Sequence, residues 1–210
     1  MRGVTSNDRQ SLAMVLVVVG LLIAGAAAPL GLTTFAINMA VHVLVLVVIA
    51  PALASIIAPR LPRISDPAIA WPAALGAALA EMVIVWGWHI PGSHAFAARN
   101  LGTLLLQQGM FLAAGTGLWL VAILAAGRAA KLIAALALFL TYSHMTMFGL
   151  VIAVTPALIY AADVCGGLGL AGVDDQHLGG VIMAVLGAPP FLLGSALCLH
   201  GAIKPSTQGG

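Results

Sequence analysis

Long apolar runs dominate the chain, and short polar or proline-rich links separate them. Six of these runs approach or exceed the roughly 20 residues that an α-helix needs to cross a bilayer. They cover approximately residues 11–28, 35–57, 68–90, 101–126, 131–154 and 178–199. The pattern predicts an all-α integral membrane protein, in which a bundle of about six transmembrane helices forms a single domain over residues 1–210.

The first run has two interpretations. It follows Arg2 and Arg9 and contains the small residues Ala26, Ala27 and Ala28, which is also typical of a signal peptide and its cleavage site. The run is nevertheless long enough to span a membrane, and five more spans follow it. These two observations favour a first span that stays with the chain.

The composition agrees with a membrane protein and excludes several other classes. Only 7% of the residues are charged, whereas soluble domains have about 25%. The basic residues are too few and too scattered for binding nucleic acid. Cys165 and Cys198 form no CxxC pair, so they predict neither a disulfide framework nor a zinc site. The sequence contains no phosphate-binding loop, nucleophile elbow or HExxH motif. We therefore expect no enzyme.

The basic residues predict the orientation of the bundle. An even number of spans places both termini on one side. That side collects seven of the eight Lys and Arg residues, namely Arg2, Arg9, Arg60, Arg63, Arg128, Lys131 and Lys204. The opposite side has Arg99 together with Asp163, Asp174 and Asp175 in a long Gly-rich loop. Because positive residues stay in the cytoplasm, both termini should be cytoplasmic.

This orientation assigns a depth to each polar side chain within the spans. Four spans carry polar or sulfur-containing side chains in the outer half of the membrane: Asn38, Met39, His42, Glu81, Gln107, Gln108, His144 and Met145. His89 and His94 lie at the outer rim, where we expect histidines in contact with water. Asp175 is expected in the outer loop.

Two interpretations of this convergence remain open. Buried polar groups can simply hydrogen-bond between helices. Alternatively, they form a metal or proton site that opens outward, since an ionisable group such as His42 or Glu81 inside a span is a functional hypothesis by default. Imidazole and thioether groups are soft ligands that suit copper(I). A haem held between His42 and His144 is a lesser alternative.

Several short motifs resemble those of one family, the CtaG-type cytochrome c oxidase assembly factors. In chain order they are Asn38-Met39-x-x-His42 before an apolar run, Trp88-His89-Ile90-Pro91, Gln107-Gln108-Gly109-Met110-Phe111 leading to Gly115 and Trp119, and Asp175-Gln176-His177-Leu178-Gly179-Gly180 leading to Met183. The resemblance covers about residues 38–183. The order and spacing of the motifs make it more specific than any one of them.

The resemblance implies a protein of a bacterial inner membrane that assists a haem–copper oxidase, with oxidase subunits and the lipid bilayer as partners. It also implies copper as the metal handled on the outer side. The candidate ligands are His42, Met39, His89, His144 and Met145. The family usually has histidine at position 38 and Glu-His at positions 107 and 108. Here these positions carry amides, which are poor copper ligands.

Two other functions compete with this one. The chain can be a structural subunit of a respiratory oxidase complex that binds no metal, since its expected ligand positions are partly lost. It can also be a transporter for protons or a small solute, with Glu81 as the group inside the membrane.

Overall fold

The computed structural model of the chain describes residues 10–15, 34–166 and 169–204. These residues form helices joined by short connections, and the one β-type pairing among them is an isolated bridge between Ile64 and Ala125. Five helical segments are long and apolar enough to cross a membrane. The first predicted span, residues 11–28, lies largely outside the described residues, of which 10–15 are helical. The count of six spans and the orientation therefore stay predictions.

The five described spans fall where the apolar runs predict them. The second predicted span consists of α2 (Phe35–Leu44), the π-helix η1 (Val45–Ile49), α3 (Ala50–Ile57) and the 3-10 helix η2 (Ala58–Arg60). The next three are α4 (Pro67–His89), α6 (Leu101–Leu124) and α7 (Gly127–Val154). The last consists of α8 (Gly172–Ile182), the π-helix η3 (Met183–Gly187) and α9 (Pro189–Ile203).

Prolines and polar caps explain where these helices change or begin. The two π-helical turns lie directly before Pro51 and Pro189. Proline has no backbone N–H and clashes with the preceding turn, so the hydrogen-bond ladder widens there. Asp66 accepts from the backbone of Ala68 at the start of α4. Asn100 accepts in the same way at the start of α6.

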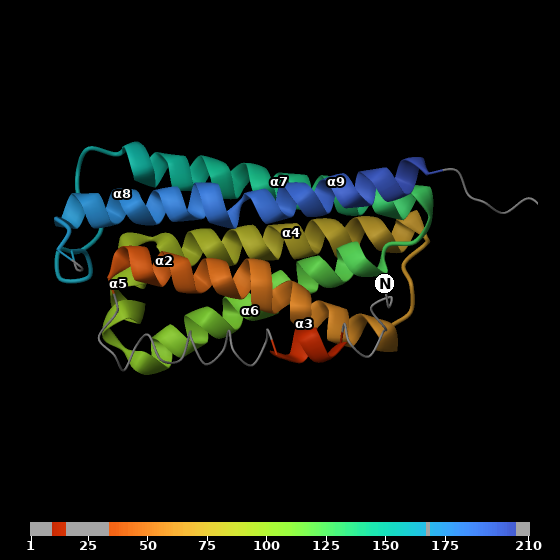
Figure 1. Cartoon of the computed structure of the whole chain (residues 1–210), viewed down its shortest axis with the longest axis horizontal. Helices are drawn as coiled ribbons and strands as arrows, with labels where there is room; N and C mark the ends of the chain where they lie inside the picture. The colour runs from red at the N-terminus through yellow and green to blue at the C-terminus, as the bar shows by residue number, and fades with distance from the viewer. Residues whose placement is uncertain (1–9, 16–33, 167–168, 205–210) are drawn as a thin grey trace, which may run out of the picture.

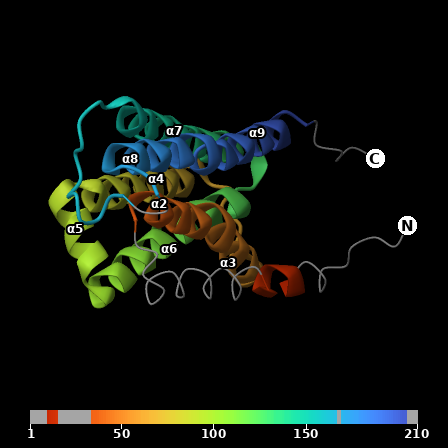
Figure 2. The same ribbon diagram turned by 60° about the vertical axis from the view of Figure 1, so that its left-hand side comes forward.

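One helix was not predicted. The link after His89 was expected to be a short polar connection, but residues Pro91–Arg99 form the helix α5. Pro91 suits the first helical position because its missing N–H is not needed there. The helix buries His94, Ala95 and Ala97. It lies at the end of the bundle where α4 stops and α6 starts (Figures 1 and 2).

Helix α7 lies along the upper edge of the bundle in Figure 1 and packs against α8, α9 and α4. The crossing of α7 and α8 needs two glycines. A Cβ atom on Gly180 would lie 2.6 Å from the carbonyl oxygen of Gly149, and one on Gly149 would lie 2.8 Å from that of Gly180. Small residues of this kind let membrane helices approach closely.

Asp175, expected in the outer loop, has a structural role instead. Asp175 belongs to the first turn of α8, is 1% exposed, and accepts hydrogen bonds from the backbone N–H groups of Phe35 and Ala36 at 3.0 and 3.2 Å. It also accepts from Gly166 N at 3.0 Å. Helix N-termini leave such N–H groups without partners and attract negative charge. Asp175 is thus the cap of α2, supplied by a distant helix.

The next two residues fasten the connection between α7 and α8. The Gln176 side chain accepts from Ile159 N at 2.7 Å and donates to Ala157 O at 3.1 Å. Nε2 of His177 lies 2.8 Å from Thr155 O. The Asp-Gln-His sequence of the motif therefore binds backbone groups rather than a ligand.

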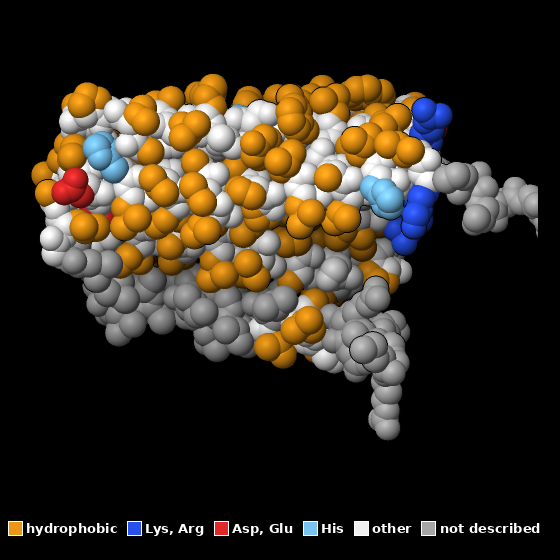
Figure 3. Space-filling view, turned by 45° about the horizontal axis from the view of Figure 1, so that its top comes forward, with side chains coloured by type: hydrophobic (Ala, Val, Ile, Leu, Met, Phe, Trp, Pro, Cys, Tyr) orange, Lys and Arg blue, Asp and Glu red, His pale blue; other side chains and the backbone are white. Residues whose placement is uncertain are grey.

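The two ends of the bundle differ in charge. We call one the basic end: it carries Arg60, Arg63, Arg128, Lys131 and Lys204, at the ends of α3, α6 and α9 and the starts of α4 and α7. Figure 3 shows the Lys and Arg side chains gathered there, beside a surface that is mostly hydrophobic. The opposite end carries the exposed ion pair of Arg99 with Asp163, at 2.7 Å.

Replacing Asp175 tests its capping role. Asp175→Ala leaves three backbone N–H groups without their acceptor, and we expect it to cost about 3 kcal/mol of stability. The thermal unfolding temperature of the detergent-solubilised protein measures the loss. Asp174→Ala removes the same charge from the neighbouring position and should leave that temperature nearly unchanged; equal losses in the two variants would contradict the assignment.

Candidate metal centre

His89, the last residue of α4, has its protonation state fixed by the backbone. Its Nδ1 lies 2.6 Å from the carbonyl oxygen of Val85. A carbonyl only accepts, so Nδ1 carries the proton and Nε2 of the neutral ring presents a lone pair. In many proteins, a hydrogen bond of this kind, from the ring nitrogen that does not bind the metal, orients a metal-binding histidine.

The lone pair of His89 faces a second lone-pair donor. Nε2 lies 3.3 Å from the sulfur of Met39 on α2. A thioether has no hydrogen to donate, so the neutral pair makes no hydrogen bond. Both side chains are buried, with 3% of His89 and 1% of Met39 exposed. Two such groups in contact favour a cation between them, either a proton or a soft metal ion.

His42 completes this donor set. Its ring centroid lies 5.1 Å from that of His89 and 5.1 Å from that of Phe111. It is fully buried, and neither ring nitrogen makes a hydrogen bond of good geometry within the described part of the chain. A buried polar group left unpaired costs about 1–3 kcal/mol. We call His42, His89 and Met39 the soft donor set.

The chemistry of this set suits one metal better than others. Among the described residues, no three His, Cys, Asp or Glu side chains gather in a way that would hold a metal ion. Zinc sites usually need such ligands in fours, or in threes with water. Two imidazoles and a thioether form a smaller and softer set, which fits copper(I).

The two rim histidines are not in contact with water as expected. His89 is 3% exposed and His94 is 1% exposed. The reason is the unpredicted α5 and the connection after α7. Tyr160 from that connection donates to the His89 carbonyl at 3.0 Å, and its ring lies 5.0 Å from that of His94. Phe35 also packs against His94, with 5.0 Å between ring centroids, and it lies beside Tyr160 at 4.2 Å.

The sequence patterns gave no sign that His94 is buried near this centre. Neither of its ring nitrogens has a hydrogen-bond partner in the described part of the chain. Burial, together with a smaller effect of the nearby His89, lowers the pKa of His94 to about 3. At neutral pH its ring is therefore uncharged, with a free lone pair next to the soft donor set.

His144 and Met145 do not join this set. His144 Nε2 lies 2.7 Å from Glu81 Oε2, and Trp86 Nε1 donates to His144 Nδ1 at 3.4 Å. Since an indole N–H only donates, the imidazole proton lies on Nε2 and points at the carboxyl group of Glu81. Met145 is fully buried, and its methyl group lies beside Gly187, close to Val43. The structure thus pairs His144 with Glu81 and Trp86 and packs the Met145 methyl group beside Gly187, and their role as ligands stays a prediction.

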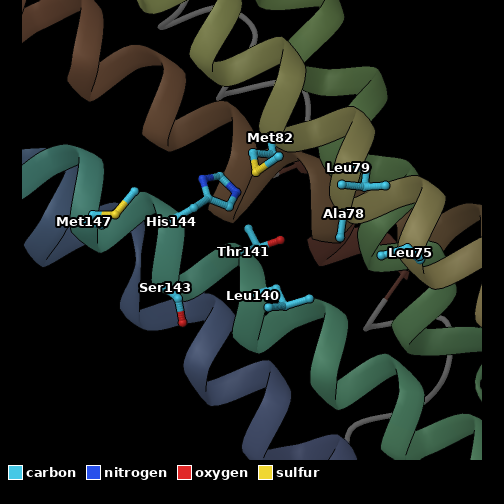
Figure 4. A pocket seen from close by; sticks show the side chains of 9 residues that line it. All are labelled: Leu75, Ala78, Leu79, Met82, Leu140, Thr141, Ser143, His144 and Met147. Carbon is cyan, nitrogen blue, oxygen red and sulfur yellow. The ribbon is translucent and has the colours of Figure 1, made fainter.

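The Glu81–His144 pair borders an apolar groove of about 350 Å³ between α4 and α7. Figure 4 shows His144 reaching from α7 toward Met82 of α4, with Leu75, Leu79 and Leu140 further along. The lining of this groove is mainly apolar, so the pair serves as a polar link between two helices.

The amides of the outer half are also buried. Asn38 and Gln107 are 6% and 1% exposed, and the side-chain oxygen of each lacks a partner among the described residues. Each lies one helical turn before a residue of the centre, Asn38 before His42 and Gln107 before Phe111, and so on the same face of its helix. Both side-chain polar atoms of Gln108 are buried without a partner there.

Fold and site together define a helical membrane protein with a soft donor set near one end of the bundle. The family model of Caa3_CtaG, described as cytochrome c oxidase caa3 assembly factor, matches residues 10–204. The chain therefore belongs to this family of assembly factors, and its role is that of an assembly or accessory factor for a cytochrome c oxidase. No curated protein and no solved structure matches the chain.

The buried, uncharged state of His94 predicts a dependence of stability on pH. The unfolded chain binds a proton to this ring below about pH 6.5, whereas the folded chain does not until about pH 3. Stability is thus present above pH 6.5 and falls by up to about 1.4 kcal/mol for each pH unit below it. Thermal unfolding between pH 5 and 8 measures this slope.

His94→Phe keeps an aromatic ring packed against Phe35 and Tyr160 and removes the titrating group. We expect this variant to show a weaker loss of stability in acid than the unchanged protein. His200→Phe, at an exposed position near the end of α9, is the control and should keep the full slope. An unchanged slope in His94→Phe would refute the assignment.

Proposed function

We propose that this assembly factor carries copper(I) as its cargo, held by His42, His89 and Met39, and hands it to a haem–copper oxidase. The observation that supports the proposal is the contact of 3.3 Å between His89 Nε2 and Met39 Sδ. The proton on Nδ1 leaves both atoms as electron-pair donors. A soft monovalent ion satisfies them and the unpaired ring of His42 together.

The transfer needs no bond-making chemistry beyond ligand exchange. An ion on two imidazoles and one thioether keeps room for a further ligand, so an incoming subunit with more donors can take it stepwise. For this reason we propose a carrier and not an enzyme. The positive-inside pattern supports a location of the soft donor set near the outer face of a bacterial inner membrane.

A structural role without metal is the second candidate function. It is favoured by the amides at positions 38, 107 and 108, where the family resemblance implies copper ligands. In this alternative the chain binds the oxidase through its large exposed apolar surface, and Asn38 and Gln107 belong to a site that has lost its metal.

Copper content decides between the two candidates. We expect the protein purified in mild detergent under reducing conditions to bind copper(I) stoichiometrically. His42→Ala and His89→Ala should each weaken binding by more than about tenfold, because losing even an outer-shell partner has that effect. Met39→Leu should weaken it less, since the two imidazoles remain. Elemental analysis and competition with a copper(I) chelator measure these effects.

His144→Ala is the matched control, since it removes a buried histidine of the same bundle that lies outside the soft donor set. It should bind copper as the unchanged protein does. A metal-free protein that still co-purifies with oxidase subunits would reject the carrier function in favour of the structural one.

A further inference from the structure

A second groove opens at the basic end of the bundle. It has a volume of about 330 Å³ and runs between α6, α7 and α9. Arg63 and Lys131 line its mouth, and Trp119, Leu138 and Leu197 line its apolar part. We call it the basic groove. The oxidase-assembly role and the proposed copper cargo do not use it.

The two cations at its mouth are held in place by the backbone. Arg63 lies in the link between η2 and α4, and this link pairs with the end of α6: Ile64 N donates to Leu124 O at 2.9 Å, and Ala126 N donates to Ile64 O at 2.8 Å. The Arg63 guanidinium donates to Ile123 O at 2.6 Å. Lys131 Nζ donates to Gly201 O at 3.1 Å.

Each cation keeps further donors for a ligand. An Arg guanidinium has five N–H groups and a Lys ammonium three. Arg63 and Lys131 each use one of these groups in a hydrogen bond to a backbone carbonyl within the described residues. Gly201 matters for this arrangement, because a Cβ atom there would lie 3.2 Å from Lys131 Nζ. The lysine therefore folds over α9 and stays at the mouth of the groove.

The floor of the groove is apolar and extends inward. Leu138 lies seven residues after Lys131 on α7, which corresponds to about 10 Å along the helix. Trp119 is anchored by its N–H to Leu46 O at 3.0 Å and stacks on Phe191. Leu197 is 63% exposed on the side of the groove.

We propose that the basic groove binds an anionic diacyl phospholipid, with its phosphate at Arg63 and Lys131 and an acyl chain along Trp119 and Leu197. Charged hydrogen bonds to phosphate oxygens match the two cations. Basic pockets between helices at the cytoplasmic face of a membrane are suited to anionic headgroups. In a phospholipid, the charged headgroup is followed directly by hydrocarbon chains. The groove has the same order, with two cations at its mouth and an apolar floor beyond them.

Native mass spectrometry of the full chain, released from nanodiscs with equal amounts of phosphatidylglycerol and phosphatidylcholine of the same acyl chains, tests the proposal. We expect selective retention of phosphatidylglycerol. Each cation near a membrane surface contributes about a fivefold preference. The double variant Arg63→Ala/Lys131→Ala should therefore lose about 25-fold in phosphatidylglycerol binding.

Arg128→Ala is the matched control. It removes one positive charge from the same end and the same helix as Lys131, at an exposed position outside the groove. It should retain the lipid. An equal loss in Arg128→Ala, or equal retention of the two lipids by the unchanged protein, would overturn the proposal in favour of general attraction or of ordinary boundary lipid.

Leu197→Trp keeps every charge and fills the apolar part of the groove, so it tests the site even if the double variant does not fold. We expect it to release phosphatidylglycerol while the helix content by circular dichroism stays unchanged. Retention of the lipid in this variant would place the lipid elsewhere and leave the groove to another occupant, such as a helix of a partner protein.

Discussion

The bond between Asp175 and the start of α2 is the interaction on which the functional end of the molecule depends. Its carboxylate accepts from Phe35 N and Ala36 N, four and three residues before Met39. One turn further, Gly179 leaves room for Phe35 and Met39, since a Cβ atom there would lie 2.9 Å from Met39 Cγ. The motif from Asp175 to Gly180 thus fixes α2, the helix that presents two of the three soft donors, although the motif contributes no donor itself.

An apolar bundle has to satisfy its buried polar groups from within, and this chain does so unevenly. Asp175, Gln176 and Ser195 find backbone partners, and Glu81 pairs with His144. His42 and His94, with one side-chain oxygen each of Asn38 and Gln107, find none within the described residues. Gln108, Thr116 and Thr141 also carry buried atoms without a partner there, so the unpaired groups are spread along the bundle. Unpaired buried groups cost free energy, and in the proposed copper site a bound ion would recover that cost at His42.

The sequence predicted the spans well because length and apolarity decide whether a helix crosses a bilayer. It also nominated His42, Met39 and His89 as candidate ligands, and the structure places His89 in contact with both other side chains, while their role as ligands stays a prediction. It misplaced His94, because burial there comes from α5 and Tyr160, and neither contact has a periodic signal. It grouped His144 and Met145 with the others by depth alone. Depth gives no direction around the helix axis, and neighbouring residues on a helix point about 100° apart.

The position of the soft donors on separately supported helices has a consequence for ligand exchange. Met39 and His42 belong to α2, which α8 caps, whereas His89 ends α4 and is oriented by Val85 and Tyr160. Within the described residues, the side chains of the set touch one another, at 3.3 Å between His89 and Met39, without a hydrogen bond between them. The proposed copper carrier has to bind its ion firmly enough to collect it and weakly enough to release it. Three donors from two helices, with amides at positions where the family resemblance implies copper ligands, favour ready release.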